Sequence, residues 1–151
     1  MAPCPRAPSL KIFCEKESAH DDRKYPSLGY YRLEQADESL EAARTLLDKK
    51  LVRPSLNRAY YTMFYAVLAL LARGKKETSK HSGAIALFDK DYVKQGIFKK
   101  DYSRWLHDAF DLRQRSDYAA EYQASPEDAE TTLKNAEAFV VEVKKVLSKE
   151  M

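Results

Sequence analysis

Residues 56–71 read LNRAYYTMFYAVLALL, and covering this apolar stretch decides how the rest of the chain must fold. All but three of these residues are apolar or aromatic, and the run has no clean polar face. A helix of this kind must be covered on several sides, by other helices of one domain or by a second copy of the chain. The run is shorter than the roughly 20 apolar residues that a membrane span needs, and Arg58 interrupts it. We therefore expect the central helix of a bundle and no membrane association.

The composition fits a small helical domain of mild charge. The chain has 151 residues with four glycines and six prolines, so helix breakers are scarce. The net charge of +3 does not by itself argue for nucleic acid. Two groups of basic residues are the candidates for RNA contact, and solvated helix faces explain them better. They are Lys75, Lys76 and Lys80, and Lys99, Lys100, Arg104, Arg113 and Arg115.

The N-terminal segment bears on localisation and on the domain boundary. Cys4 and Cys14 are the only cysteines, and their spacing is typical of neither a metal site nor a redox centre. The N-terminus lacks the apolar core of a signal peptide, so we expect a cytoplasmic protein. Residues 1–28 contain four of the six prolines and no sustained periodicity. They are expected to form an irregular N-terminal arm, and residues 29–151 the helical bundle.

Four further segments repeat apolar residues every three or four positions, which predicts helices around the central one. They span about 29–48, 80–93, 102–120 and 126–149. Gly74 is expected to end the central helix in a left-handed conformation, Thr78 or Ser79 to cap the next helix, and Ser125 with Pro126 to start the last. The predicted fold class is all-α, an up-and-down antiparallel bundle of about five helices.

Charged residues end the apolar stripe of the fourth predicted helix. Ala109, Arg113 and Asp117 are spaced i, i+4, i+8, so a guanidinium and a carboxylate project from the end of its inward face. Buried charges have to be paired. Two interpretations stay open: a structural Arg–Asp pair that fixes the bundle, or a polar cleft in which Arg113 binds a phosphate.

Other polar residues are candidates for completing a site with Arg113. His81 starts the third predicted helix, where an anion could bind, although a capping or surface His is the simpler interpretation. Asn57, Arg58 and Tyr61 head the polar part of the central helix; such tyrosines more often lie in the core with the hydroxyl bonded to a neighbour. No Gly-rich phosphate loop, Cys/His metal set or Ser/His/Asp set is visible, so we expect no metal and no cofactor.

Three motifs, in this order, resemble the HEPN domain family, named for nucleotide binding in higher eukaryotes and prokaryotes. They are NRAYYTMFYAVLALL at 57–71, SKHSG at 79–83 and LRQRSDY at 112–118. The resemblance covers about residues 29–151 and implies a helical bundle that forms a homodimer. It also implies the toxin of a two-gene toxin–antitoxin module, whose antitoxin partner is a minimal nucleotidyltransferase.

In active members of that family, an Arg followed after four to six residues by a His forms a metal-independent ribonuclease site across the dimer. Arg113 matches that Arg, but Asp117 and Tyr118 stand where the His would be. A Tyr, with its pKa of about 10, replaces His as a hydrogen-bonding group more readily than as a base. The resemblance therefore implies a site of Arg113, Asp117 and Tyr118 that binds RNA or a nucleotide, with RNA cleavage as the less favoured activity. The rival from another class is a non-catalytic dimerisation or interaction module whose Arg–Asp pair is structural.

Overall fold

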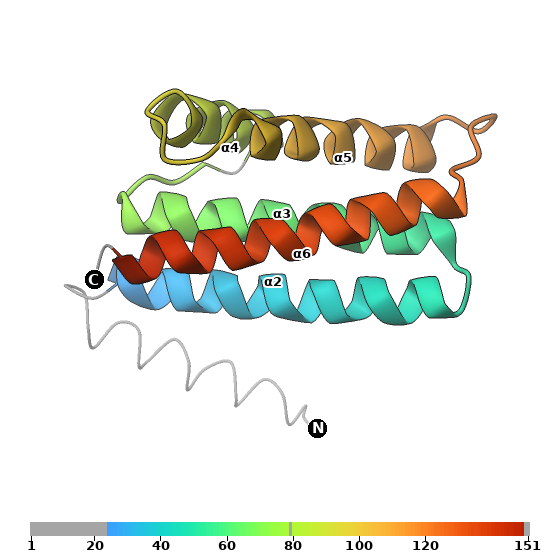
Figure 1. The fold of residues 1–151 in the computed structure, drawn as a ribbon, viewed down its shortest axis with the longest axis horizontal. Helices are drawn as coiled ribbons and strands as arrows, with labels where there is room; N and C mark the ends of the chain where they lie inside the picture. The colour runs from blue at the N-terminus through green and yellow to red at the C-terminus, as the bar shows by residue number, and fades with distance from the viewer. Residues whose placement is uncertain (1–23, 79, 150–151) are drawn as a thin grey trace, which may run out of the picture.

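The structure, a computed structural model, describes residues 24–78 and 80–149, with side chains from residue 28 onward. All the regular elements of these residues are helical, which confirms the predicted all-α bundle (Figure 1). They are α2 (Lys24–Asp48), α3 (Val52–Arg73), α4 (His81–Phe88), the π-helical turn η2 (Asp89–Val93), α5 (Lys100–Tyr118) and α6 (Pro126–Lys149).

The first described helix begins earlier than the sequence pattern suggests. Helix α2 starts at Lys24, whereas the expected start lay near Gly29. Pro26 falls in the first turn, where its missing N–H removes no helix hydrogen bond and its fixed φ suits the helix. The rest of the expected arm, residues 1–23 with both cysteines, lies outside the described residues.

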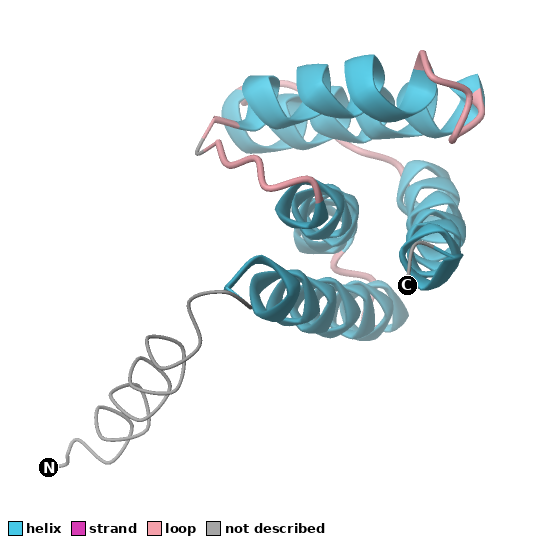
Figure 2. Cartoon of the chain, turned by 90° about the vertical axis from the view of Figure 1, so that its left-hand side faces the viewer, coloured by secondary structure: helices cyan, strands magenta, loops and turns pink. Residues whose placement is uncertain are grey.

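Helix α3 runs through the middle of the bundle. It packs against α2, α4, α5 and α6, and the chain alternates in direction from α2 to α3 and from α5 to α6 (Figure 1). Seen end on, α2 and the α4–α5 pair lie on opposite sides of α3, and α6 covers one flank (Figure 2). The other flank of α3 carries no helix of the described chain (Figure 2).

The core forms around the face of α3 that the sequence marks as most apolar. Thirteen of its residues are buried, and those facing the other helices join a single cluster with them. Its members include Tyr60, Met63, Val67 and Leu70 of α3, Ala36 and Leu40 of α2, Phe88 of α4, Leu106 and Ala109 of α5, and Phe139 and Val143 of α6. Another row of α3 residues at helical spacing is only half-buried: Asn57, Tyr61, Tyr65 and Leu68.

Two expectations about helix ends are wrong. Gly74 has φ −82°, and the left-handed residue is Lys75, with φ 61°. The Lys75 amide donates to the Ala72 carbonyl and the Lys76 amide to the Leu71 carbonyl, which are the two hydrogen bonds of a Schellman motif. In this motif the left-handed residue is the one after Gly74. At α4 the N-cap is Lys80 in place of Thr78, and no side chain of the described residues caps the helix; Ser79 lies outside them.

The start of α6 follows the sequence expectation. The Asp128 amide donates to Ser125 Oγ at 3.0 Å, and the Ser125 amide donates back to the Asp128 carboxylate at 3.5 Å. This reciprocal capping fixes the helix start at Pro126. Across the described ranges, no helix combines the length and the apolar character needed to cross a membrane.

Candidate functional site

Polar and aromatic side chains from α3, α4 and α5 converge around Arg113, and we call them the Arg113 cluster. Its members are Asn57, Arg58, Tyr60, Tyr61 and Phe64 of α3, His81 of α4, and Phe110, Arg113 and Asp117 of α5. The structure therefore brings together all the predicted site residues except Tyr118.

Arg113 lies among aromatic rings at the end of the inward face of α5. Its side chain is 12% exposed, and its guanidinium carbon is 5.2 Å from the ring centroid of Tyr60, 5.6 Å from Tyr61 and 5.9 Å from Phe110. Nη1 donates a hydrogen bond of 3.4 Å to the Tyr61 hydroxyl. Nε is buried and has no hydrogen-bond partner among the described residues. The rings thus hold the cation mainly through their faces.

The Arg113–Asp117 pair is open. Nη1 of Arg113 is 3.9 Å from Oδ2 of Asp117, too far for a hydrogen bond. The same Oδ2 accepts a bond of 3.4 Å from Asn57 Nδ2, and the Asp117 side chain is 25% exposed. The closed, buried pair of the structural interpretation is not the arrangement in this structure.

A second guanidinium lies against the ring of Tyr61. The Arg58 guanidinium carbon is 4.8 Å from that ring centroid, and its Nε and Nη2 donate to Asn57 Oδ1 at 3.2 and 3.0 Å. Tyr61 therefore has two arginines against its ring, with Asp117 as the carboxylate beside them. The local charge favours an anionic ligand.

His81 is neither a capping residue nor a free surface residue. Its ring stacks on Phe64 with centroids 4.2 Å apart and planes 2° apart. Its Nδ1 is 2.7 Å from the Tyr60 hydroxyl, and Tyr60 is fully buried. Burial, and then the charge of Arg113, lower the pKa of His81. Burial raises the pKa of Tyr60 far above its usual range, so this pair is neutral.

Tyr118 lies apart from the cluster. It is 76% exposed and makes no hydrogen bond or ring contact with any other described residue. Because one helical position turns the side chain by about 100°, Tyr118 leaves the face that Asp117 shares with Arg113. His107 is exposed and pairs with Asp89 at 2.8 Å.

Three aromatic residues of the cluster were not among the predicted site residues: Tyr60, Phe64 and Phe110. Tyr60 and Phe64 are buried, but the rings also position Arg113 and His81. The only signal in the sequence was the hydroxyl of Tyr60, since a buried Tyr needs a hydrogen-bond partner. Its partner, His81, is 21 positions away, so the pattern along one helix could not identify it.

The predicted basic groups are surface residues, apart from Arg113. Lys75, Lys76 and Lys80 are exposed, and Lys76 pairs with Asp91. The residues of the second group are also exposed, and Arg104 pairs with a neighbour one turn earlier. Within the described part of the chain, no three His, Cys, Asp or Glu side chains gather closely enough to hold a metal ion.

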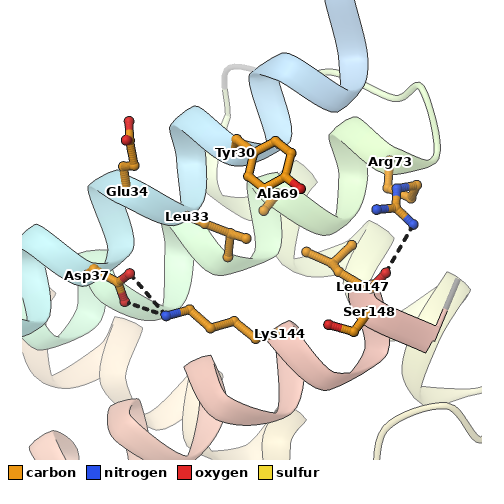
Figure 3. Close-up of a pocket in the computed structure, with 10 residues that line it drawn as sticks. Tyr30, Leu33, Glu34, Asp37, Ala69, Arg73, Lys144, Leu147 and Ser148 are labelled. Atoms are coloured by element: carbon orange, nitrogen blue, oxygen red, sulfur yellow. Dashed lines mark hydrogen bonds and ion pairs between the residues drawn. The ribbon is translucent and has the colours of Figure 1, made fainter. Parts of the chain in front are cut away.

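A separate groove of about 400 Å³ lies between α2, α3 and α6 (Figure 3). Leu33 and Leu147 line it, and Lys144 donates to both carboxylate oxygens of Asp37 at 3.0 Å across it. Arg73 Nη1 donates to the Leu147 carbonyl at 3.4 Å. The groove shares no residue with the Arg113 cluster.

Comparison with known proteins places the chain in a family. The HEPN domain matches residues 30–146. A protein of Methanocaldococcus jannaschii named "Putative toxin MJ0605" is 36% identical over 115 residues, 76% of this chain and 85% of that protein. A second protein of the same organism, "Putative toxin MJ0142", is 33% identical over 76% of this chain and 78% of its own length. A "UPF0332 protein" of Thermotoga maritima is 31% identical over 126 residues, 83% of this chain and 95% of that protein. The match over most of the chain, together with the helical bundle, shows that this protein belongs to the HEPN domain family.

Proposed function

We propose that this chain is a toxin-like HEPN protein that binds a phosphate of RNA or of a nucleotide at the Arg113 cluster. The names of the two Methanocaldococcus jannaschii relatives support the toxin-like part of the proposal. The geometry of Arg113 supports an anionic ligand, because its anionic partner Asp117 is 3.9 Å from Nη1 and accepts no hydrogen bond from it.

The unused donors of Arg113 are the observation that carries the proposal. A guanidinium has five N–H groups, and within the described residues Arg113 uses one, in a long bond to Tyr61. A largely buried cation with so few hydrogen bonds costs free energy, and a phosphate would supply acceptors for several donors at once. Arg58 adds positive charge next to the same Tyr61 ring.

The aromatic residues of the cluster favour a ligand that carries a nucleobase. Tyr61 and Tyr65 of α3 are half-buried, and their ring centroids are 5.7 Å apart. Unstacked bases of RNA and of nucleotides stack on such rings, which adds roughly 1–3 kcal/mol per base. The cluster therefore offers charge for a phosphate next to rings for a base.

Binding is a better-supported activity than cleavage. Tyr118, one of the two residues that stand where active family members have the His, is exposed and makes no contact with Arg113. Asp117 reaches the cluster but bonds to Asn57. Tyr118 lies away from the guanidinium, and the Asp117 oxygen nearest to it is bonded to Asn57, so we propose ligand binding without assigning a hydrolytic step.

Fluorescence anisotropy with a labelled single-stranded RNA, and competition with ATP, tests the proposal. Arg113→Ala should weaken binding by about 2 kcal/mol or more, and Arg113→Lys should restore only part, because a lysine lacks the planar fork. Arg115→Ala is the matched control, since Arg115 is exposed on the same helix. If neither RNA nor ATP binds, or if both alanine variants bind equally, the cluster is not the site and an interaction module becomes the better description.

We also propose, from the family resemblance, that a minimal nucleotidyltransferase is the partner and neutralises this protein by binding it or by nucleotidylating a tyrosine. Tyr118 is the more accessible acceptor, because the Tyr122 hydroxyl donates to Asp128 at 3.3 Å. Co-expression with an adjacent nucleotidyltransferase gene, affinity capture and intact-mass measurement should show a complex or an added nucleotide that Tyr118→Phe prevents. The absence of both would contradict the partnership.

A further inference from the structure

One ring nitrogen of His81 is engaged inside the cluster, and the other is not fully buried. Nδ1 is engaged with the Tyr60 hydroxyl at 2.7 Å. Nε2 has no hydrogen-bond partner among the described residues, and it is not among the buried atoms that lack one. The stack on Phe64 holds the ring plane. Nε2 is therefore fixed in direction and open to a ligand.

The contact with Tyr60 also fixes which nitrogen carries the proton. Tyr60 is fully buried, and Nδ1 is the only partner of its hydroxyl in the described chain. A buried O–H that lost its acceptor would cost the desolvation of that group, so the hydroxyl donates and Nδ1 accepts. A neutral imidazole has one N–H, and here it must be on Nε2.

His81 and Arg113 share the same surroundings. The His81 ring centroid is 5.6 Å from those of Tyr60 and Tyr61 and 6.5 Å from that of Phe110, the three rings that also contact Arg113. Both side chains thus lie next to the same three aromatic rings, and each has an N–H donor without a hydrogen-bond partner among the described residues.

We propose that His81, held by Tyr60 in the Nε2–H tautomer, donates a hydrogen bond to a phosphate oxygen of the ligand that Arg113 binds. This inference rests on the proposed function of the cluster. His81 is then a binding residue, and Tyr60 is a positioning residue that acts through it. Because Nε2 already carries a proton, His81 does not serve as a general base for the ligand.

Two amide substitutions of His81 distinguish the role of Nδ1 from that of Nε2. In His81→Gln the amide reaches the position of Nε2 and keeps a donor there, whereas in His81→Asn it reaches only the position of Nδ1. A hydrogen bond to a charged group is worth a factor of roughly 10 to 100 in affinity. We expect His81→Asn to bind RNA and ATP at least about tenfold more weakly than His81→Gln, which should stay within about threefold of wild type. Equal affinities of the two variants would overturn the proposal.

The tautomer can be read without any ligand. Nitrogen-15 NMR of the full-length protein at pH 7 should show the imidazole proton of His81 on Nε2 in wild type and a mixture of tautomers in Tyr60→Phe. A proton on Nδ1 in wild type would refute the inference. Arg113→Ala is measured in parallel: if it binds like wild type, the proposed function fails, and if it binds weakly while His81→Asn binds like wild type, only this inference fails. Thermal melts confirm that each variant is folded.

Discussion

Arg113 is held mainly by cation–π contacts with aromatic rings and by the packing of its aliphatic stem, and much less by Asp117. The ion pair is open at 3.9 Å, and Asp117 keeps solvent contact and a bond to Asn57. Removing the guanidinium therefore leaves no isolated buried carboxylate, which is the situation that makes the loss of a buried pair cost several kcal/mol.

We expect Arg113→Ala to lower the free energy of unfolding by about 1–2 kcal/mol, from lost cation–π contacts and lost stem packing. Urea melts of wild type, Arg113→Ala and the double variant Arg113→Ala/Asp117→Ala measure it. The double variant should be no more stable than the single one. A loss of stability that the second substitution largely rescues would instead show that the pair is structural.

The neutrality of His81 predicts a pH dependence of stability. Burial and then Arg113 lower its folded-state pKa from 6.5, so the unfolded chain binds more protons between the folded-state pKa and 6.5. The stabilisation by neutral His81 is full above pH 6.5 and is lost as the pH falls from there through the folded-state pKa. Between pH 7.5 and 5.5 the wild type should lose more stability than His81→Gln. Parallel curves for the two proteins would contradict this expectation.

At the scale of elements, the end of α3 shows how a helix stop can differ from its sequence signal. Lys75 is left-handed with φ 61°, next to a glycine that is not. A Cβ on Gly74 would come no closer than 3.7 Å to the Leu71 carbonyl oxygen, an ordinary contact. The turn therefore requires a left-handed residue at position 75, which is a lysine, while the glycine stands at position 74, where φ is ordinary.

Two substitutions test this reading of the turn. Lys75→Gly should stabilise the protein by roughly 0.5–1 kcal/mol, because it removes the strain of a left-handed lysine. Gly74→Ala should be neutral or slightly stabilising, because its φ is ordinary. Differential scanning calorimetry compares both with wild type. If Gly74→Ala destabilises strongly while Lys75→Gly does not stabilise, the conformations of the two residues are exchanged in solution.

At the scale of the whole molecule, the covering of α3 is uneven. Four helices pack against it, and one flank carries no helix of the described residues (Figure 2). Three large side chains of α3, Tyr61, Tyr65 and Leu68, are only half-buried. Half-buried aromatic and aliphatic side chains on an open flank are typical of a surface that a second copy covers.

We therefore predict that the isolated chain is a homodimer at micromolar concentration. Multi-angle light scattering measures the mass directly. A charged residue on the open flank, as in Leu68→Glu, should shift the equilibrium toward the monomer, whereas Val141→Glu on α6, which is exposed elsewhere, should not. A monomeric wild type would remove the claim.

The sequence by itself determined the helices and most of their boundaries. The hydrogen bonds of a helix join residues four positions apart, so apolar spacing, Pro54 in the first turn of α3 and the Ser125 cap of α6 carry that information locally. It also gave the family and the location of Arg113 at the end of an inward face. The residues it named for the site were largely those that the structure brings together, since Arg113 and Asp117 share one helix face.

Only the tertiary structure decided how these residues meet. The Tyr60–His81 bond joins residues 21 positions apart, and the Arg113–Tyr61 bond joins residues 52 positions apart. Contacts of that range depend on how α4 and α5 dock on α3, which no periodicity along a single helix encodes. The docking brings the rings of Tyr60 and Phe110 against the Arg113 guanidinium and encloses the inner nitrogen of His81, which contacts the Tyr60 hydroxyl.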